Sequence, residues 1–211
     1  MEDFADSGRP GDTPTRGGGL LEGYLARKRA QVAEGLIDQR HRAGRILDLG
    51  CGKIPFFLLH TDFAQKAGIE RQVNPNASEL ADKYGIFMIE YDLSSSLNLP
   101  CRAKTFDVIT MLAVLEHLPE ACRLDLMKQV CRCLKPGGAL ILTTPAAWLD
   151  RVLRIMAKCR LVSEMEVGEH RSACHARYLR QLLTNAGFSA ERVTVGSYLF
   201  GAALYARAVR K

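Results

Sequence analysis

The sequence predicts an α/β domain with a doubly wound, mostly parallel sheet, and three observations support this class. Short apolar segments alternate with helical patterns from about residue 45 onward, which is the order of a parallel sheet covered by helices on both faces. Of the 211 residues, 47% are hydrophobic and 25% are charged, as in ordinary globular domains. A chain of this length buries one core well but is too short for two.

Seven segments are expected to form the strands. The fourth is the most apolar, and the last two are separated only by a short turn around Gly201. A connection of that length makes them antiparallel neighbours, so the last strand of the chain should be antiparallel in an otherwise mostly parallel sheet. In chain order the expected strands are 45–49, 69–73, 86–91, 106–115, 139–143, 192–200 and 203–209.

Helices are predicted between these strands from apolar residues that recur at helical spacing. Pro119 suits the first turn of the helix before the fifth strand, and the Lys-Pro-Gly-Gly sequence at 135–138 should stop that helix and form a turn. The expected helices cover 20–42, 55–66, 77–84, 119–134 and 174–185, and Gly68 is interpreted as the stop after the second of them.

Two segments fall outside this alternation. Residues 1–19 are rich in glycine, proline and polar side chains, a composition that buries too little surface to become ordered, so a flexible tail is expected. Residues 146–170 carry an apolar stripe after the fifth strand. The stripe either packs as ordinary core or forms a lid over a site. Residues 20–211 are therefore interpreted as a single domain with an N-terminal helix and a lid-like insertion.

Composition and charge limit the partners and the compartment. No apolar run approaches the roughly 20 residues of a membrane span, and the acidic start Met-Glu-Asp-Phe lacks the hydrophobic region of a secretory signal. The seven cysteines contain no Cys-x-x-Cys pair, which favours inert thiols in a reducing, cytoplasmic compartment and gives no metal spacing. The net charge of +6 is dispersed along the chain, so a nucleic-acid partner is disfavoured, although an anionic substrate is compatible. The oligomeric state stays open.

The most informative site follows the first strand, where Asp48 leads into Gly50 and Gly52. Glycines let a backbone approach a ligand closely, and the carboxyl edge of an open α/β sheet is where ligands bind. Glu70 lies about 20 residues further on, where a carboxylate can accept the ribose hydroxyls of an adenosine ligand. Taken alone, each feature has an ordinary structural explanation: a tight turn and a surface glutamate.

Five motifs in order make the pattern specific. They are Asp-Leu-Gly-Cys-Gly at 48–52, Phe-Asp-Val-Ile at 106–109, Leu-Glu-His-Leu at 115–118, Leu-Lys-Pro-Gly-Gly at 134–138 and Ala-Gly-Phe at 186–188. Together they resemble the class I S-adenosylmethionine-dependent methyltransferases, and among them the small-molecule branch known as methyltransferase type 11. The resemblance covers about residues 45–210 and implies a Rossmann-like, seven-stranded sheet.

The resemblance also implies a cofactor, S-adenosyl-L-methionine, and roles for matching residues. Asp48, Gly50 and Gly52 would border its methionine part, with Asp48 near the ammonium group. Glu70 would hold the ribose hydroxyls. Asp92 and the Leu93 backbone would meet the adenine, and the residues after strand four that would line the site are Met111, Leu112 and Ala113. The implied acceptor is a small molecule such as a sugar, a lipid-linked compound or a secondary metabolite.

One departure from the family pattern concerns the glycine turn. The family usually has a third glycine where this chain has Ile54, followed by Pro55. A side chain at that position is expected to crowd the turn and to weaken cofactor approach. Pro55 also disrupts the glycine spacing of a nicotinamide dinucleotide site. A dinucleotide-binding sheet has no closing antiparallel hairpin of the kind predicted here, so a nicotinamide oxidoreductase is disfavoured.

Methyl transfer by direct displacement needs positioning more than covalent help. A hydroxyl acceptor would also need a base, for which His117 and His170 are the candidates. The ordinary structural explanation of His117 is packing or a hydrogen bond to a loop carbonyl, and His170 lies in a polar stretch typical of a surface. Two other functions remain open: a module that binds S-adenosylmethionine without catalysis, which the Ile54 departure favours, and an RNA methyltransferase, which the net charge favours.

Overall fold

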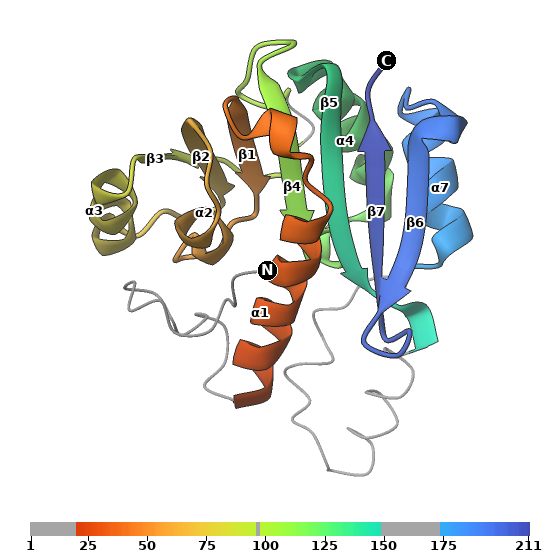
Figure 1. Ribbon diagram of the computed structural model, residues 1–211, viewed down its shortest axis with the longest axis horizontal. Coiled ribbons are helices and arrows are strands. Elements are labelled where there is room, and N and C mark those ends of the chain that lie inside the picture. The colour runs from red at the N-terminus through yellow and green to blue at the C-terminus, as the bar shows by residue number, and fades with distance from the viewer. Residues whose placement is uncertain (1–19, 96–97, 149–173) are drawn as a thin grey trace.

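The computed structural model describes residues 20–95, 98–148 and 174–211. Seven strands form one sheet in the order β3-β2-β1-β4-β5-β7-β6 (Figure 1). The pairs among β1, β2, β3, β4 and β5 are parallel, and β7 runs antiparallel to both β5 and β6. The predicted fold class is therefore confirmed. The strands are β1 (Arg45–Leu49), β2 (Gln65–Glu70), β3 (Ile86–Glu90), β4 (Phe106–Leu112), β5 (Leu134–Pro145), β6 (Val193–Tyr198) and β7 (Ala203–Val209).

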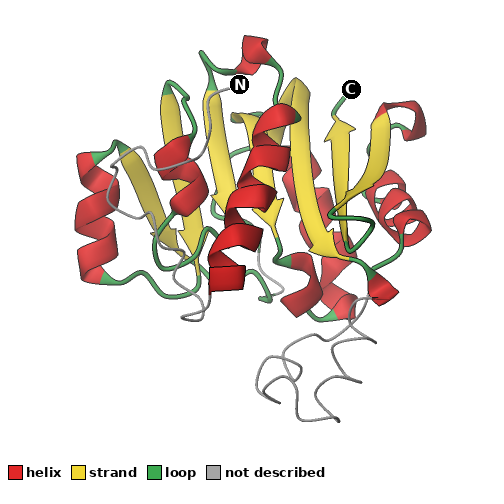
Figure 2. Cartoon of the chain, turned by 60° about the horizontal axis from the view of Figure 1, so that its bottom comes forward, coloured by secondary structure: helices red, strands yellow, loops and turns green. Residues whose placement is uncertain are grey.

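Helices cover both faces of the sheet (Figure 2). Successive residues of a strand point to opposite faces, so Ile46 packs with the first three helices while Leu47 packs with the last two. In Figure 1, α1 crosses the sheet in front of β4 and β5, with α4 behind. The helices are α1 (Leu20–Gly35), α2 (Phe56–His60), α3 (Pro75–Lys83), α4 (Glu120–Cys133) and α7 (Ala176–Asn185), and three short 3₁₀ turns are η1 (Gln39–His41), η2 (Leu115–His117) and η3 (Ala190–Arg192).

The largest error of prediction concerns β2. The strand was expected at 69–73 after a helix over 55–66, but β2 is Gln65–Glu70 and α2 ends at His60. The glycine that was read as a helix stop, Gly68, is paired inside the strand with Asp48 and Met88. A side chain there would lie 2.7 Å from the Cys51 sulfur, so glycine is needed for close packing within the strand.

Other bounds also differ from the prediction. The first helix ends at Gly35 instead of 42, and the fourth strand ends at Leu112 instead of 115 because Ala113 turns the chain with a φ of 56°. The Lys-Pro-Gly-Gly sequence lies within β5, where Leu134 pairs with Phe106 and Ala139 with Val108. The four residues between them oppose one residue of β4. The predicted turn is thus a bulge inside a longer strand.

The insertion predicted at 146–170 lies mostly outside the described residues, as does the tail 1–19. Its two flanks meet: Ala146 pairs with Cys174, and the Ala147 N–H donates to the Cys174 carbonyl over 3.1 Å. Both flanks therefore adjoin the carboxyl end of β5. Among the described residues, no helix is both long and apolar enough to cross a membrane.

Candidate functional site

The carboxyl ends of the parallel strands lie along the lower edge of the sheet in Figure 1. The glycine turn follows β1 at this edge, and the N–H groups of Gly50 and Cys51 donate to the Ile69 carbonyl over 2.8 and 3.2 Å. Gly50 has a φ of 69°, and a Cβ there would lie 2.6 Å from Val114 Cγ2. Both the backbone conformation and the space at this position therefore require glycine.

Glu70, the last residue of β2, is bound to the glycine turn. Its carboxylate accepts hydrogen bonds from the Gly52 N–H at 2.8 Å and from its neighbour Arg71 N–H at 3.0 Å. The structure therefore places the Glu70 side chain beside Gly52. The two predicted residues are thus brought together.

Asp48 lies next to the end of β1 and is only 3% exposed. Its Oδ1 accepts a hydrogen bond from the Thr110 hydroxyl at 2.6 Å. Burial raises its pKa to about 7, the Thr110 hydrogen bond partly opposes that shift, and the negative charge of Glu70 adds to it. This carboxyl therefore changes charge near neutral pH and responds to any cation placed beside it.

Asp92 and Leu93 follow β3 at the same edge. The Tyr91 N–H donates to the Glu70 carbonyl over 2.9 Å, which fixes this loop to the end of β2. Asp92 is exposed, and its Oδ1 accepts from the Ser94 hydroxyl and N–H. These hydrogen bonds lower the pKa of Asp92, and Arg71 contributes. Leu93 is buried in the core.

The last residues of β4 and the residue that follows it divide between core and edge. Met111 is fully buried, whereas Leu112 and Ala113 are partly exposed. Ala113 has the left-handed φ of 56°, and its N–H donates to the Thr143 carbonyl over 3.0 Å. A non-glycine residue in this conformation costs free energy, and such positions gather at functional sites. The strained residue places Val114 against Gly50.

Ile54, at the third position of the glycine pattern, is half-buried and packs against the core under α1 and α2. Its carbonyl accepts the Phe56 N–H at 2.8 Å, at the start of α2. The turn therefore accommodates this side chain by packing it against the core.

The two histidines proposed as bases have different outcomes. His117 is half-buried on η2, where its backbone N–H donates to the Val114 carbonyl over 3.0 Å. His170 lies outside the described residues. His117 therefore lies at the same edge of the sheet as the glycine turn, and its role as a base stays a prediction.

A buried glutamate that the sequence interpretation did not single out precedes His117. Glu116 is 3% exposed, and its Oε2 accepts a hydrogen bond from the Thr144 hydroxyl at 3.2 Å. Burial raises its pKa to about 7, although its own N–H, Arg29, Thr144 and Arg123 oppose the shift. The two consecutive threonines ending β5 were the available signal, because polar side chains at a strand end need partners.

Polar groups from three further elements surround this glutamate. β6 runs parallel to β5 because each is antiparallel to β7, so Tyr198 ends β6 at the same edge. Burial raises the Tyr198 pKa, while the charge of Arg29 and a polar contact with Thr143 oppose the shift. Arg29 comes from α1, and the buried Arg123 of α4 donates twice to the Leu118 carbonyl.

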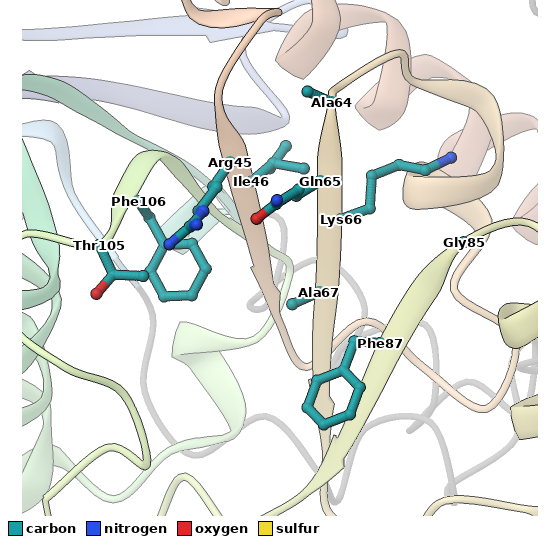
Figure 3. Close-up of a pocket in the computed structure, with 10 residues that line it drawn as sticks. All are labelled: Arg45, Ile46, Ala64, Gln65, Lys66, Ala67, Gly85, Phe87, Thr105 and Phe106. Atoms are coloured by element: carbon teal, nitrogen blue, oxygen red, sulfur yellow. The ribbon is translucent and has the colours of Figure 1, made fainter.

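A cavity of about 410 Å³ lies elsewhere, at the starts of β1 and β2 (Figure 3). Its lining includes Arg45 and Gln65, the first residues of these strands, and Phe87 of β3, which is 67% exposed. These residues lie at the edge opposite the glycine turn. None of the residues predicted for the site lines this cavity.

The amino-acid sequence of this chain is similar to those of known methyltransferases. Residues 21–193 match the model of a family described as a methyltransferase domain. The chain is 34% identical over 108 residues to the 27-O-demethylrifamycin SV methyltransferase of Amycolatopsis mediterranei, covering 48% of this chain and 39% of that protein. It is 31% identical over 103 residues to the tRNA U34 carboxymethyltransferase of Desulfotalea psychrophila, covering 47% and 32%. The matches thus span less than half the length of these relatives.

Among solved structures, the fold is similar to that of a methyltransferase from Thermotoga maritima described as a possible histamine N-methyltransferase. The TM-score is 0.64 at 21% identity, over 91% of this chain and 96% of that one. At this identity the likeness concerns the fold. The match over most of the sequence and the seven-stranded sheet with its closing hairpin together show that this chain belongs to the family of class I S-adenosylmethionine-dependent methyltransferases.

Proposed function

We propose that this chain binds S-adenosylmethionine at the carboxyl edge of its sheet and catalyses methyl transfer to a small-molecule acceptor. The cofactor supplies a methyl group on a sulfonium and leaves as a neutral thioether. Residues at the edge suit its chemistry. Gly50 lets the turn pack against Val114 where a side chain would not fit, and two carboxyl groups, Asp48 and Glu70, suit a ligand that carries an ammonium and two ribose hydroxyls.

One observation carries the proposal: the Glu70 carboxylate and the Gly52 N–H are joined over 2.8 Å beside the buried Asp48. In this arrangement Glu70 binds the ribose and Asp48 the ammonium group. Asp92 and the Leu93 backbone, after the neighbouring strand β3, receive the adenine. Leu112 and Ala113 border the methionine part from β4, with Met111 supporting them from the core.

This orientation sets the side from which the acceptor arrives. The ribose and adenine positions lie over β2 and β3, so the reactive methyl points toward β4 and β5. The polar groups on that side are Glu116, Thr144, Tyr198 and Arg29. We propose that they receive a hydroxyl acceptor, with Glu116 or His117 taking its proton. The relative that methylates a rifamycin oxygen supports a hydroxyl acceptor.

The test measures binding and turnover together. Calorimetry with S-adenosylmethionine should give a dissociation constant at least tenfold higher for Asp48→Asn and for Glu70→Gln, because each change removes a charge but keeps an acceptor for Thr110 or Gly52. The matched control is Asp125→Asn, whose carboxylate is exposed on α4 and pairs only with Lys128 among the described residues. Unchanged affinity in folded Asp48→Asn and Glu70→Gln proteins would contradict the proposal.

Turnover decides between the remaining functions. Transfer of a labelled methyl group to hydroxyl-bearing small molecules supports the enzyme. Tight binding without turnover on any acceptor would favour a module that only binds the cofactor. The similarity to a tRNA-modifying protein gives an RNA acceptor a specific basis, and RNA binding that falls steeply with salt would identify that case.

A further inference from the structure

Two cysteines that lie far apart in the sequence meet in the structure. Cys101 belongs to the loop before β4, and Cys133 is the last residue of α4. Their sulfur atoms are 3.2 Å apart, and the Cys133 sulfur is also 3.7 Å from the Cys101 carbonyl oxygen. Cys101 is partly exposed, whereas Cys133 is buried. The sequence contains no Cys-x-x-Cys pair and predicted inert thiols, and this pair lies outside the proposed cofactor site.

Backbone hydrogen bonds hold the two segments against each other. The Lys104 N–H donates to the Arg132 carbonyl over 2.9 Å, and the Thr105 N–H donates to the Cys133 carbonyl over 2.8 Å. The Arg132 guanidinium reaches the Leu99 carbonyl at 3.4 Å. These bonds lie on both sides of Cys101. The closeness of the two sulfur atoms is therefore imposed by the backbone and does not depend on the thiol rotamers alone.

The surroundings also favour a thiolate at one member of the pair. The hydrogen bond with Cys101 lowers the pKa of Cys133; burial opposes this shift, and the charges of Arg132 and Arg210 add to it. Arg210 is held nearby because it donates to the Arg132 and Leu134 carbonyls. The thiolate is the reactive form of cysteine, and a second thiol in contact can complete the bond.

We propose that Cys101 and Cys133 are a dithiol modification site that a peroxide converts into an intramolecular disulfide. One sulfur takes an oxygen atom from hydrogen peroxide to become a sulfenic acid, and the first water leaves. The other sulfur then attacks it, the S–O bond breaks, the S–S bond forms and a second water leaves. The two thiols lose two electrons and two protons in total. Closure needs an approach of about 1.2 Å between the sulfur atoms, since a disulfide spans about 2.05 Å.

The position of the pair predicts what oxidation does. Thr105 directly precedes β4, so the sulfur atoms lie near the start of this strand, away from the glycine turn that follows β1. The bond would close a loop that includes β4 and α4, which restricts the unfolded chain. Oxidation should therefore raise the melting temperature, by roughly 5 °C or more, and leave the affinity for S-adenosylmethionine within about twofold.

Peptide mapping tests the site directly. The folded full chain is treated with hydrogen peroxide, alkylated and digested with trypsin without reduction. Trypsin places Cys101 in peptide 84–102, Cys131 in 129–132 and Cys133 in 133–151, because Lys135 precedes a proline and is not cleaved. We expect the 84–102 and 133–151 peptides to appear linked. Cys131→Ser is the matched control, two residues away, and should form the same link.

Several outcomes would overturn the proposal. They are alkylation of Cys101 and Cys133 at the same rate before and after peroxide, a link from Cys133 to Cys131 in place of Cys101, and a link that forms no faster in the folded chain than in urea. Because the peptide map is made on the wild-type chain, the test does not depend on whether a substituted protein folds. Cys101→Ser and Cys133→Ser serve as further controls, and both should abolish the link and the rise in melting temperature.

Discussion

Gly50 and Gly85 have nearly the same backbone conformation, with φ of 69° and 65°, but different surroundings. A Cβ at Gly50 would lie 2.6 Å from Val114, while a Cβ at Gly85 would meet nothing within 4 Å. Gly85→Ala should therefore lower the free energy of unfolding by about 1–2 kcal/mol from backbone strain alone.

Gly50→Ala should lower the free energy of unfolding by more than Gly85→Ala does, because the turn must move away from Val114. For the same reason it should weaken cofactor binding at least tenfold. Urea unfolding and calorimetry on the two variants measure both effects. Equal losses of stability with unchanged cofactor affinity would contradict the role given to this turn.

Single residues also show which parts of the site can be predicted from the sequence. Asp48, Gly50 and Glu70 were identified because their spacing is local or nearly so, and the structure brings them together. Glu116 was missed as a polar centre. Its polar neighbours Thr144 and Tyr198 come from strands that lie 28 and more residues away in the sequence. No short motif contains that juxtaposition.

Besides its hydrogen bonds to Ile69 and Glu70, the glycine turn packs on β2 through the Cys51 side chain, which lies against Gly68. A Cβ at Gly68 would lie 2.7 Å from the Cys51 sulfur, closer than to Met88 at 3.1 Å or Leu58 at 3.2 Å. Gly68→Ala should displace the turn and weaken S-adenosylmethionine binding severalfold, and Cys51→Ala in the same chain should restore most of the affinity.

Calorimetry on the two single variants and the double variant gives the coupling between the two positions. A double variant that binds no better than Gly68→Ala would show that the turn is not positioned by this contact.

The same contact explains why sequence patterns misplaced an element. Gly68 was taken as a helix stop because glycine usually ends a helix, whereas here close packing requires it inside a strand. In β5, the Lys-Pro-Gly-Gly sequence was predicted to be a turn, so the strand was expected to begin after the bulge that this sequence forms. Order and type of the strands were predictable from alternation, but bounds that depend on neighbouring strands were not.

At the scale of the whole molecule, two buried carboxyl groups among the described residues, Asp48 and Glu116, have pKa values near 7. Their ordinary values are 3.8 and 4.5, so between about pH 4 and 7 the folded state binds more protons than the unfolded state. Stability should therefore fall as pH rises through this window, by up to a few kcal/mol for each group.

Urea unfolding at pH 5 and pH 8 measures this effect. Asp48→Asn and Glu116→Gln should each lose less stability over the interval than the wild type. The lowered pKa of His41 acts in the opposite direction near its ordinary value of 6.5, but it is common to all three proteins and cancels in the difference. Identical pH dependence in the wild type and both variants would contradict the burial of these charges.

A structure of the full chain with S-adenosylhomocysteine decides most directly where the cofactor binds. The ribose hydroxyls should lie on Glu70, the ammonium group near Asp48, and the sulfur should face the ends of β4 and β5. A ligand found in the cavity at the starts of β1 and β2, or a ribose that makes no contact with Glu70, would show that the glycine turn is not the cofactor site.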